Sequence, residues 1–251
     1  MPFVIDKIIQ IKKYFLPTAY DRYLKKLHEN RVQFYSQFIN KGDLCFDIGA
    51  NMGNRTEIFL KLGAKVIAVE PQESCYQYLN NKFVKKATII KKGIGSKNEM
   101  KDFFISNHNQ LSTFSKEWIQ TLQSDRFKES KWYESKPIEI ITLDSIIEKT
   151  KIPQFIKIDV EGFELEVFKG LSKPFRFLCF EFAVPDNLIN LQLSLEQLHT
   201  NYKNLVFNYA EMDNTFLELN QWISYNEIME LINTEEFSLH SAGDIYVKNL
   251  S

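Results

Sequence analysis

The sequence predicts a doubly wound α/β fold, in which a mostly parallel β-sheet carries helices on both faces. From residue 43 onward, short apolar runs alternate with segments of helical periodicity, as expected for a parallel sheet covered by helices. Two of the runs, FIKIDV at 155–160 and FRFLCFEF at 175–182, are almost continuously apolar. Such runs are typical of strands buried at the centre of a parallel sheet.

The predicted elements follow one another along the chain, and glycine or proline residues end several of them. The first strand leads into Gly49, the helix after it ends at Gly63, and Pro71 stops the second strand. We expect strands at 44–49, 65–70, 88–94, 100–106, 137–141, 155–160, 175–182, 204–209 and 243–248. We expect helices at 56–62, 72–84, 143–149, 163–168 and 188–198.

One α/β domain accounts for most of the 251 residues, because no repeat, low-complexity tract or linker divides the chain. We expect a helical extension over residues 1–40 and the α/β domain over residues 41–251. The polar stretch 107–136 is too long for an ordinary connection, so we expect it to be a functional insertion or lid. Its aromatic side chains could stack on a ligand or pin the segment to the body: Phe114, Trp118, Trp132 and Tyr133.

Composition limits the partners of the protein. The chain has 31 basic and 32 acidic residues, a balance that provides no general field for binding nucleic acid. No apolar run approaches the roughly 20 residues that span a bilayer. Residues 1–17 predict a helix packed on the body, with contact to a membrane surface or a partner as the alternative. The oligomeric state stays open.

The cysteines carry no signature of a metal site or a CxxC redox motif. They are far apart in the sequence, and two of them lie within apolar runs, where a buried reduced thiol is usual. This pattern predicts a reducing compartment and a cytoplasmic location for the protein. The three residues are Cys45, Cys75 and Cys179.

Chemically useful residues lie at the carboxyl ends of the predicted strands, where open α/β sheets bind ligands. The first strand ends in the turn DIGANMG at 47–53, whose glycines let the backbone turn tightly and approach a ligand. The second strand ends at Glu70, about 20 residues beyond the start of this turn. At that spacing a carboxylate can reach the ribose hydroxyls of a nucleoside.

Two classes of cofactor suit this geometry. A dinucleotide would require GxGxxG, whereas the turn here is DxGxxxG and lacks the second glycine that admits a pyrophosphate. The carboxylate of Asp47 favours a cationic ligand over a phosphate. S-adenosylmethionine is cationic, contains a ribose and has no phosphate, so it fits better. A nicotinamide-dependent oxidoreductase is the alternative.

Five segments of the chain share the order and spacing of one known family: FDIGANMGNRT (46–56), AVEPQ (68–72), TLDSII (142–147), FIKIDVEGFELEVFKG (155–170) and CFEF (179–182). On these residues, which span about half of the chain, the sequence resembles the FkbM-type methyltransferases of the class I S-adenosylmethionine-dependent group. The resemblance implies a seven-stranded, Rossmann-like methyltransferase sheet. It also implies methyl transfer to a hydroxyl oxygen of a sugar, glycan or polyketide-like small-molecule acceptor.

The resemblance further implies which residues bind the cofactor. Residues of the glycine turn would border its methionine part, Glu70 would accept hydrogen bonds from both ribose hydroxyls, and Asp159 would face the sulfonium. Pro71 and Ile94, beside Gly93, would sandwich the adenine. The residues assigned to the glycine turn are Asp47, Gly49, Ala50, Asn51 and Gly53.

A hydroxyl acceptor must lose its proton, so we expect a general base near the transferred methyl group. The candidates are Asp159, Glu161, Glu181 and His108, and the sequence does not choose among them. Each of the last three also has an ordinary structural interpretation. Glu161 could be an acid that stabilises a helix N-terminus, Glu181 a buried hydrogen-bonded carboxylate, and His108 a solvated loop residue.

The same residues allow three alternatives: a divalent metal site, a binding protein without turnover, and an RNA methyltransferase. The carboxylates could coordinate a divalent cation, but they have no metal-specific spacing, so no metal ligand is assigned. A methyltransferase-like binding protein without turnover is the non-enzymatic alternative. An RNA methyltransferase would require a basic surface strip, which the balanced charge does not suggest.

Overall fold

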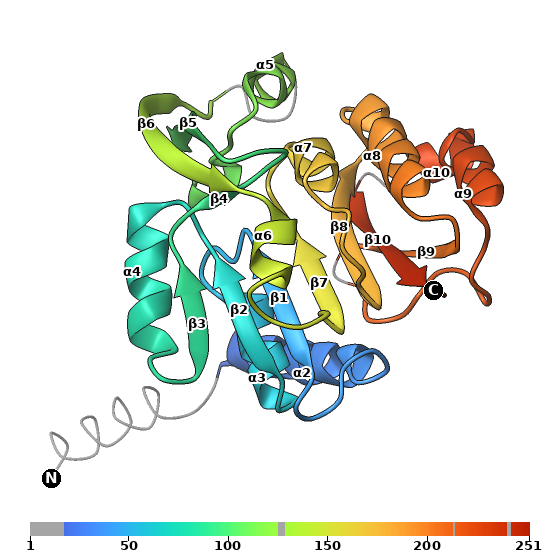
Figure 1. Cartoon of the computed structure of the whole chain (residues 1–251), viewed down its shortest axis with the longest axis horizontal. Helices are drawn as coiled ribbons and strands as arrows, with labels where there is room; N and C mark the ends of the chain where they lie inside the picture. Colours follow the sequence, from blue (N-terminus) through green and yellow to red (C-terminus); the bar gives the residue numbers. More distant parts are fainter. Residues whose placement is uncertain (1–17, 125–128, 213, 240–241) are drawn as a thin grey trace, which may run out of the picture.

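A seven-stranded sheet forms the centre of the protein, in the strand order β3-β2-β1-β7-β8-β10-β9 (Figure 1). The computed structural model describes residues 18–124, 129–212, 214–239 and 242–251, so the helix predicted over residues 1–17 lies outside the described residues. Only β10 runs antiparallel to its neighbours, which confirms a doubly wound, mostly parallel sheet. The strands are β1 (Leu44–Ile48), β2 (Lys65–Val69), β3 (Ala87–Ile90), β7 (Phe155–Ile158), β8 (Phe177–Ala183), β9 (Leu205–Glu211) and β10 (Ala242–Asn249).

Helices cover both faces of this sheet because alternate residues of each strand point to opposite sides. In β1, for example, Phe46 and Ile48 belong to one hydrophobic cluster and Cys45 to another. The first cluster packs under α6 (Leu143–Ile147), α7 (Glu164–Lys169), α8 (Leu188–Asn201), α9 (Tyr225–Ile232) and α10 (Glu235–Ser238). The opposite face carries α2 (Ala19–Tyr35), α3 (Asn54–Lys61) and α4 (Glu73–Lys82).

The register of the parallel strands brings four strand ends to one edge of the sheet. Ile48 of β1 lies opposite Val69 of β2 on one side and Ile158 of β7 on the other. Ile158 in turn lies opposite Phe180 of β8. The residues that directly follow these positions therefore lie side by side at the carboxyl edge: Gly49, Glu70, Asp159 and Glu181.

A second, three-stranded sheet stands above this edge (Figure 1). It consists of β4 (Gly93–Ile94), β5 (Glu99–Ser106) and β6 (Trp132–Ile141). The prediction of one strand over 88–94 is therefore wrong, because the chain leaves the main sheet after β3 and pairs with β6 instead. The stretch 107–136 is not one polar loop either, because it holds the 3-10 turn η1 (Asn109–Leu111), helix α5 (Lys116–Ser124) and the start of β6.

Helices α9 and α10 were missing from the sequence-based prediction. Helix α9 begins with a capping box, in which the Ser224 hydroxyl accepts from the Glu227 N–H and the Glu227 carboxylate accepts from the Ser224 N–H. Its apolar face buries Ile228 and Ile232 against the main cluster. The pattern Ser-x-x-Glu before an apolar run was thus a signal for this helix in the sequence.

Two further sequence-based expectations can be compared with the structure. Cys45 and Cys179 are free and buried, as predicted from their apolar surroundings, and Cys75 is free and buried as well. Within the part of the chain that the structure describes, no helix combines the length and the apolar character needed to cross a membrane.

The sheet edge depends on a close backbone approach at Gly49. Substitution of this glycine therefore tests the fold. A Cβ atom at Gly49 would collide with the carbonyl oxygen of Asp159, whereas one at Gly42 would meet nothing within 4 Å. Both residues have a left-handed backbone, with φ of 77° and 91°. We expect Gly42→Ala to lower the free energy of unfolding by about 1–2 kcal/mol. Gly49→Ala should lower it by about 1–3 kcal/mol more, measured by urea denaturation. Equal losses would contradict the close approach.

Candidate functional site

A cavity of about 630 Å³ opens at the carboxyl edge of β1, β2, β7 and β8. Its walls are the loops that follow these strands, the end of β4 and part of the 107–136 insertion. The structure therefore brings together nearly all of the residues predicted from the sequence. Those that line the cavity are Asp47, Gly49, Ala50, Asn51, Glu70, Pro71, Gly93, Ile94, Asp159, Glu161 and Glu181.

Two predicted residues lie outside the cavity lining. A Cβ at Gly53 would collide with the side chains of Leu79 and Phe83, so Gly53 permits the close packing of its turn on α4. His108 is exposed at the start of η1, where its backbone N–H donates to the Ser106 hydroxyl at 3.2 Å. The structure thus gives Gly53 a packing role and places His108 on the surface of the insertion.

Glu70 ties the ends of β1 and β2 together. One carboxylate oxygen accepts from the N–H of Asn51 at 2.8 Å, and the other accepts from the N–H of Gln72 at 2.7 Å. Burial raises the pKa of Glu70 to about 7, although both N–H groups oppose the shift by favouring the ionised form. The Glu70 carboxylate is therefore a fixed hydrogen-bond acceptor on the cavity wall.

The glycine turn is held in place by the neighbouring strand. The N–H groups of Gly49 and Ala50 both donate to the carbonyl of Val69, at 2.9 and 3.1 Å. These two N–H groups are engaged in the fold and do not serve as donors for a ligand in this structure. Asp47, just before the turn, is buried and accepts from the Thr56 hydroxyl at 2.5 Å. Burial raises the pKa of Asp47 above its usual value.

A buried ion pair below the cavity involves a residue that the sequence analysis did not single out. Lys157 is only 2% exposed, and its Nζ lies 2.8 Å from Oδ1 of Asp244 and 3.5 Å from Oδ2 of Asp159. Burial alone would lower the pKa of Lys157, but the two carboxylates outweigh it and raise the pKa. A lysine inside the apolar run FIKIDV was the signal in the sequence, because a buried charge requires a partner.

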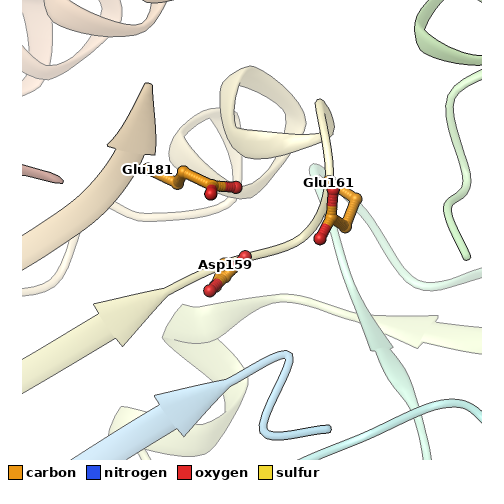
Figure 2. Close-up of side chains that lie close together, drawn as sticks. All are labelled: Asp159, Glu161 and Glu181. Carbon is orange, nitrogen blue, oxygen red and sulfur yellow. The ribbon is translucent and has the colours of Figure 1, made fainter. Parts of the chain in front are cut away.

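Three carboxylates gather at the far side of the cavity (Figure 2). Asp159 follows β7, Glu181 lies on β8, and Glu161 belongs to the loop before α7; oxygens of all three lie within 4.8 Å of one another. Burial, and then the negative charge of Asp159, raise the pKa values of Glu161 and Glu181 well above the usual range. Carboxylate oxygens at this spacing could accept protons or coordinate a divalent cation.

The loop that carries Glu161 is fixed by contacts on both sides. Glu161 has a left-handed backbone with φ of 53°, and its carbonyl accepts from the Thr113 hydroxyl of the insertion at 2.7 Å. The buried carboxylate of Glu164 accepts from the N–H groups of Val160 and Gly162, each at 3.3 Å. Glu164 is a positioning residue that the sequence analysis missed, although it lies in the motif DVEGFE.

The aromatic residues of the insertion divide into different roles. Phe114 packs against Phe103 and Phe163, with ring centroids 4.7 and 5.5 Å away. The indole N–H of Trp132 donates to a backbone carbonyl, so both residues pin the segment to the body. Tyr133 is exposed. Phe114 and Trp118 are both buried and both line the cavity, and Trp118 is the one of the two that carries a polar group.

Comparison with protein families identifies the class of protein that carries this site. A family model described as the methyltransferase FkbM domain matches residues 47–227, which is more than half of the chain. The chain therefore belongs to the FkbM family of S-adenosylmethionine-dependent methyltransferases. No curated protein matches the sequence.

Several solved structures are similar to this chain at low sequence identity. A precorrin-6y C5,15-methyltransferase from Geobacter metallireducens is 10% identical, with 88% of this chain and 87% of that chain covered and a TM-score of 0.44. A TehB-like SAM-dependent methyltransferase from Corynebacterium glutamicum is 9% identical (92% and 95% covered, TM-score 0.47). Aeropyrum pernix fibrillarin, with bound S-adenosyl-L-methionine, is 6% identical (88% and 75% covered, TM-score 0.47). At these TM-scores the similarities carry no argument about activity.

The Lys157–Asp244 pair makes a prediction about stability. Lys157→Met would leave the Asp244 carboxylate buried without its main partner, so we expect the free energy of unfolding to fall by about 3–5 kcal/mol. Adding Asp244→Asn should restore part of the loss, because the more deeply buried of the two carboxylates that Lys157 contacts is then neutral. The control is Lys173→Met, which breaks an exposed ion pair with Glu148 and should cost about 0–1 kcal/mol. Equal effects in denaturant titrations would show that the buried pair is not important for folding.

Proposed function

We propose that this protein transfers the methyl group of S-adenosylmethionine to a hydroxyl oxygen of a sugar, glycan or polyketide-like acceptor. The observation that carries the proposal is that Glu70, at the end of β2, and the cluster of three carboxylates beside β7 and β8 line one and the same cavity. Glu70 suits the ribose of the cofactor, and the carboxylates suit the removal of a proton from a hydroxyl. The proposed catalytic unit is the domain over residues 41–251, preceded by the extension 1–40, with the segment 107–136 forming the wall on the acceptor side.

The cofactor would lie across the strand ends. Glu70 would accept hydrogen bonds from the ribose hydroxyls, and the side chain of Asn51 would contact the methionine part. Pro71 and Ile94, which both line the cavity, would hold the adenine between them. The positive sulfonium would face Asp159, whose carboxylate attracts it at short range. Bound in this way, S-adenosylmethionine would direct its methyl group toward the three carboxylates.

The transfer itself would be an in-line displacement at the methyl carbon. The acceptor oxygen forms the new C–O bond while the C–S bond breaks. The electron pair of the broken C–S bond stays on sulfur, which gives S-adenosylhomocysteine. The hydroxyl proton passes to a carboxylate. Holding the two reactants in line can contribute about 7–11 kcal/mol in well-oriented systems. A general base typically adds about 10²–10⁴-fold in rate.

Glu161 and Glu181 are the bases that the geometry favours over His108. Both line the cavity, and burial raises their pKa values, which makes each a stronger base once it is ionised. His108 lies outside the lining and is exposed. A divalent cation held by the three carboxylates would supply acidification of a bound hydroxyl. The step described above does not depend on such a cation.

The role of Glu70 can be tested by binding. Glu70→Ala should weaken the binding of S-adenosylhomocysteine tenfold or more in a calorimetric titration, because hydrogen bonds to a charged group are worth about 1.5–3 kcal/mol each. Glu73→Ala, which removes an exposed carboxylate nearby, should leave the affinity unchanged. In thermal denaturation, S-adenosylhomocysteine should stabilise the wild-type protein and NAD should not. Unchanged affinity of Glu70→Ala would exclude the ribose role.

The pKa of Glu70 gives the binding a pH dependence. The ionised carboxylate accepts hydrogen bonds from both hydroxyls, whereas the protonated form loses one acceptor site. Because burial raises the pKa of Glu70 to about 7, affinity for S-adenosylhomocysteine should increase as the pH rises through neutrality. Glu70→Gln cannot titrate, so its weaker affinity should vary less with pH. Affinity that falls as the pH rises would contradict this assignment.

The base can be identified by conservative substitution. We expect Glu161→Gln or Glu181→Gln to lower kcat by about 10²–10⁴-fold. Affinity for S-adenosylhomocysteine should change little, and Glu166→Gln, on the same helix as Glu164 but outside the cavity, should leave kcat unchanged. Wild-type kcat should rise with pH, because the base must be ionised. Transfer that a chelator abolishes and magnesium restores would instead assign the carboxylates to a cation.

A further inference from the structure

Trp118 is a buried side chain whose indole N–H lies at hydrogen-bond geometry to no acceptor among the described residues. It is 8% exposed and lines the cavity, and its indole N–H forms no hydrogen bond with any residue that the structure describes. Buried N–H groups in native proteins nearly always have a partner, so an exception beside a cavity points to a ligand. Trp132, in the same insertion, is the matched contrast, because its indole N–H donates to the carbonyl of Leu111 at 2.8 Å.

Packing holds the Trp118 ring against the loop that carries Glu161. A Cβ atom at Gly162 would lie 2.5 Å from Cγ of Trp118, so the ring rests directly on the glycine backbone. The backbone N–H of Trp118, as distinct from its indole N–H, donates to the Ser115 hydroxyl at 3.0 Å, near the start of α5. The hydroxyl of Thr113 bonds the Glu161 carbonyl from the same side. The indole is therefore fixed in place before any ligand binds.

The cavity wall around Trp118 combines one donor with several acceptors. The indole N–H lies close enough to Glu161 to lower the pKa of that carboxyl, against the larger effect of burial, but it does not reach the geometry of a hydrogen bond. The carboxylates of Asp159 and Glu181 lie within 4.8 Å of that of Glu161. A ligand here meets an N–H that requires an acceptor and carboxylates that require donors or cations.

A hydroxyl group satisfies both requirements, because its oxygen accepts while its hydrogen is donated. A phosphate or carboxylate could accept from the indole, but it would bring a further negative charge to a wall where burial and Asp159 already disfavour the ionised forms of Glu161 and Glu181. An ammonium group would be attracted by the acids, but it has no lone pair and would leave the indole N–H without a partner. Several hydroxyls on neighbouring carbons match this wall best.

We propose that Trp118 and Glu161 form the recognition site for a neutral, polyhydroxylated acceptor such as an uncharged sugar ring. One acceptor oxygen takes the hydrogen bond from Nε1 of Trp118, and the neighbouring hydroxyls donate to Glu161 and Glu181. This site selects against acceptors with a phosphate or carboxylate next to the methylated hydroxyl. The inference rests on the proposed function and adds the charge and hydrogen-bonding class of the acceptor.

The charge of the acceptor can be tested with matched sugars. Transfer of radiolabelled methyl from S-adenosylmethionine is measured to the methyl glycosides of glucose, galactose, mannose and rhamnose, and to methyl glucuronide and glucose 6-phosphate. We expect transfer to at least one neutral glycoside, with kcat/KM at least about tenfold lower for the charged sugars. Preference for a charged sugar, or no transfer to any neutral glycoside while S-adenosylhomocysteine still binds, overturns the inference. Failure to bind S-adenosylhomocysteine would instead overturn the proposed function.

The role of Trp118 is separated from packing by comparing Trp118→Phe with Trp132→Phe. Trp118→Phe keeps an aromatic ring beside Gly162 but removes the N–H donor together with part of the indole ring. We expect its KM for the neutral glycoside to rise roughly tenfold, with unchanged affinity for S-adenosylhomocysteine. We expect both variants to melt earlier, because both lose buried ring volume and Trp132→Phe also leaves the Leu111 carbonyl unpaired. Only Trp118→Phe should raise the KM, because Trp132 does not line the cavity. An unchanged KM for Trp118→Phe, or an equal rise in KM for Trp132→Phe, contradicts the inference.

Discussion

The site depends on how closely the backbones of β1 and β7 approach each other at their carboxyl ends. Gly49 lies against the carbonyl of Asp159, where no side chain fits between them. Because β1 is paired on both sides in parallel register, this approach also fixes the position of Glu70 on β2 and of Glu181 on β8 relative to the turn. The Asn51 N–H then bonds the Glu70 carboxylate and joins the two strand ends directly. One steric constraint thus sets the distance between the proposed cofactor and acceptor sides of the cavity.

The charge distribution of the cavity depends on which acidic and basic side chains are buried together. Lys157 compensates the charge of Asp244 beneath the sheet edge and lowers the pKa of that carboxyl, so Asp244 can be ionised although it is largely buried. Glu161 and Glu181 form no ion pair among the described residues, and burial beside Asp159 raises their pKa values. Carboxyls with raised pKa values in a cleft are characteristic of sites that transfer protons. A cationic cofactor and a hydroxyl acceptor are both compatible with this distribution of charge.

Much of the fold and of the site could be predicted from the sequence, because both depend on local patterns. Buried runs such as 155–160 indicated the strands, and residues that follow parallel strands share one edge whatever the strand order. The division of 88–94 between two sheets could not be predicted, because apolar periodicity does not say which neighbour a strand pairs with. The partners Lys157 and Asp244 are 87 residues apart, so their contact depends on the register of the folded sheet. The unpaired indole of Trp118 is likewise visible only once the insertion is packed on Gly162.

A crystal structure of the complex with S-adenosylhomocysteine would test the central claim most directly. The account predicts that both ribose hydroxyls lie within hydrogen-bonding distance of the Glu70 carboxylate. The sulfur should face Asp159, with open space between it and the carboxylates of Glu161 and Glu181. A nucleoside bound away from Glu70, or a sulfur directed away from these three acids, would contradict the account.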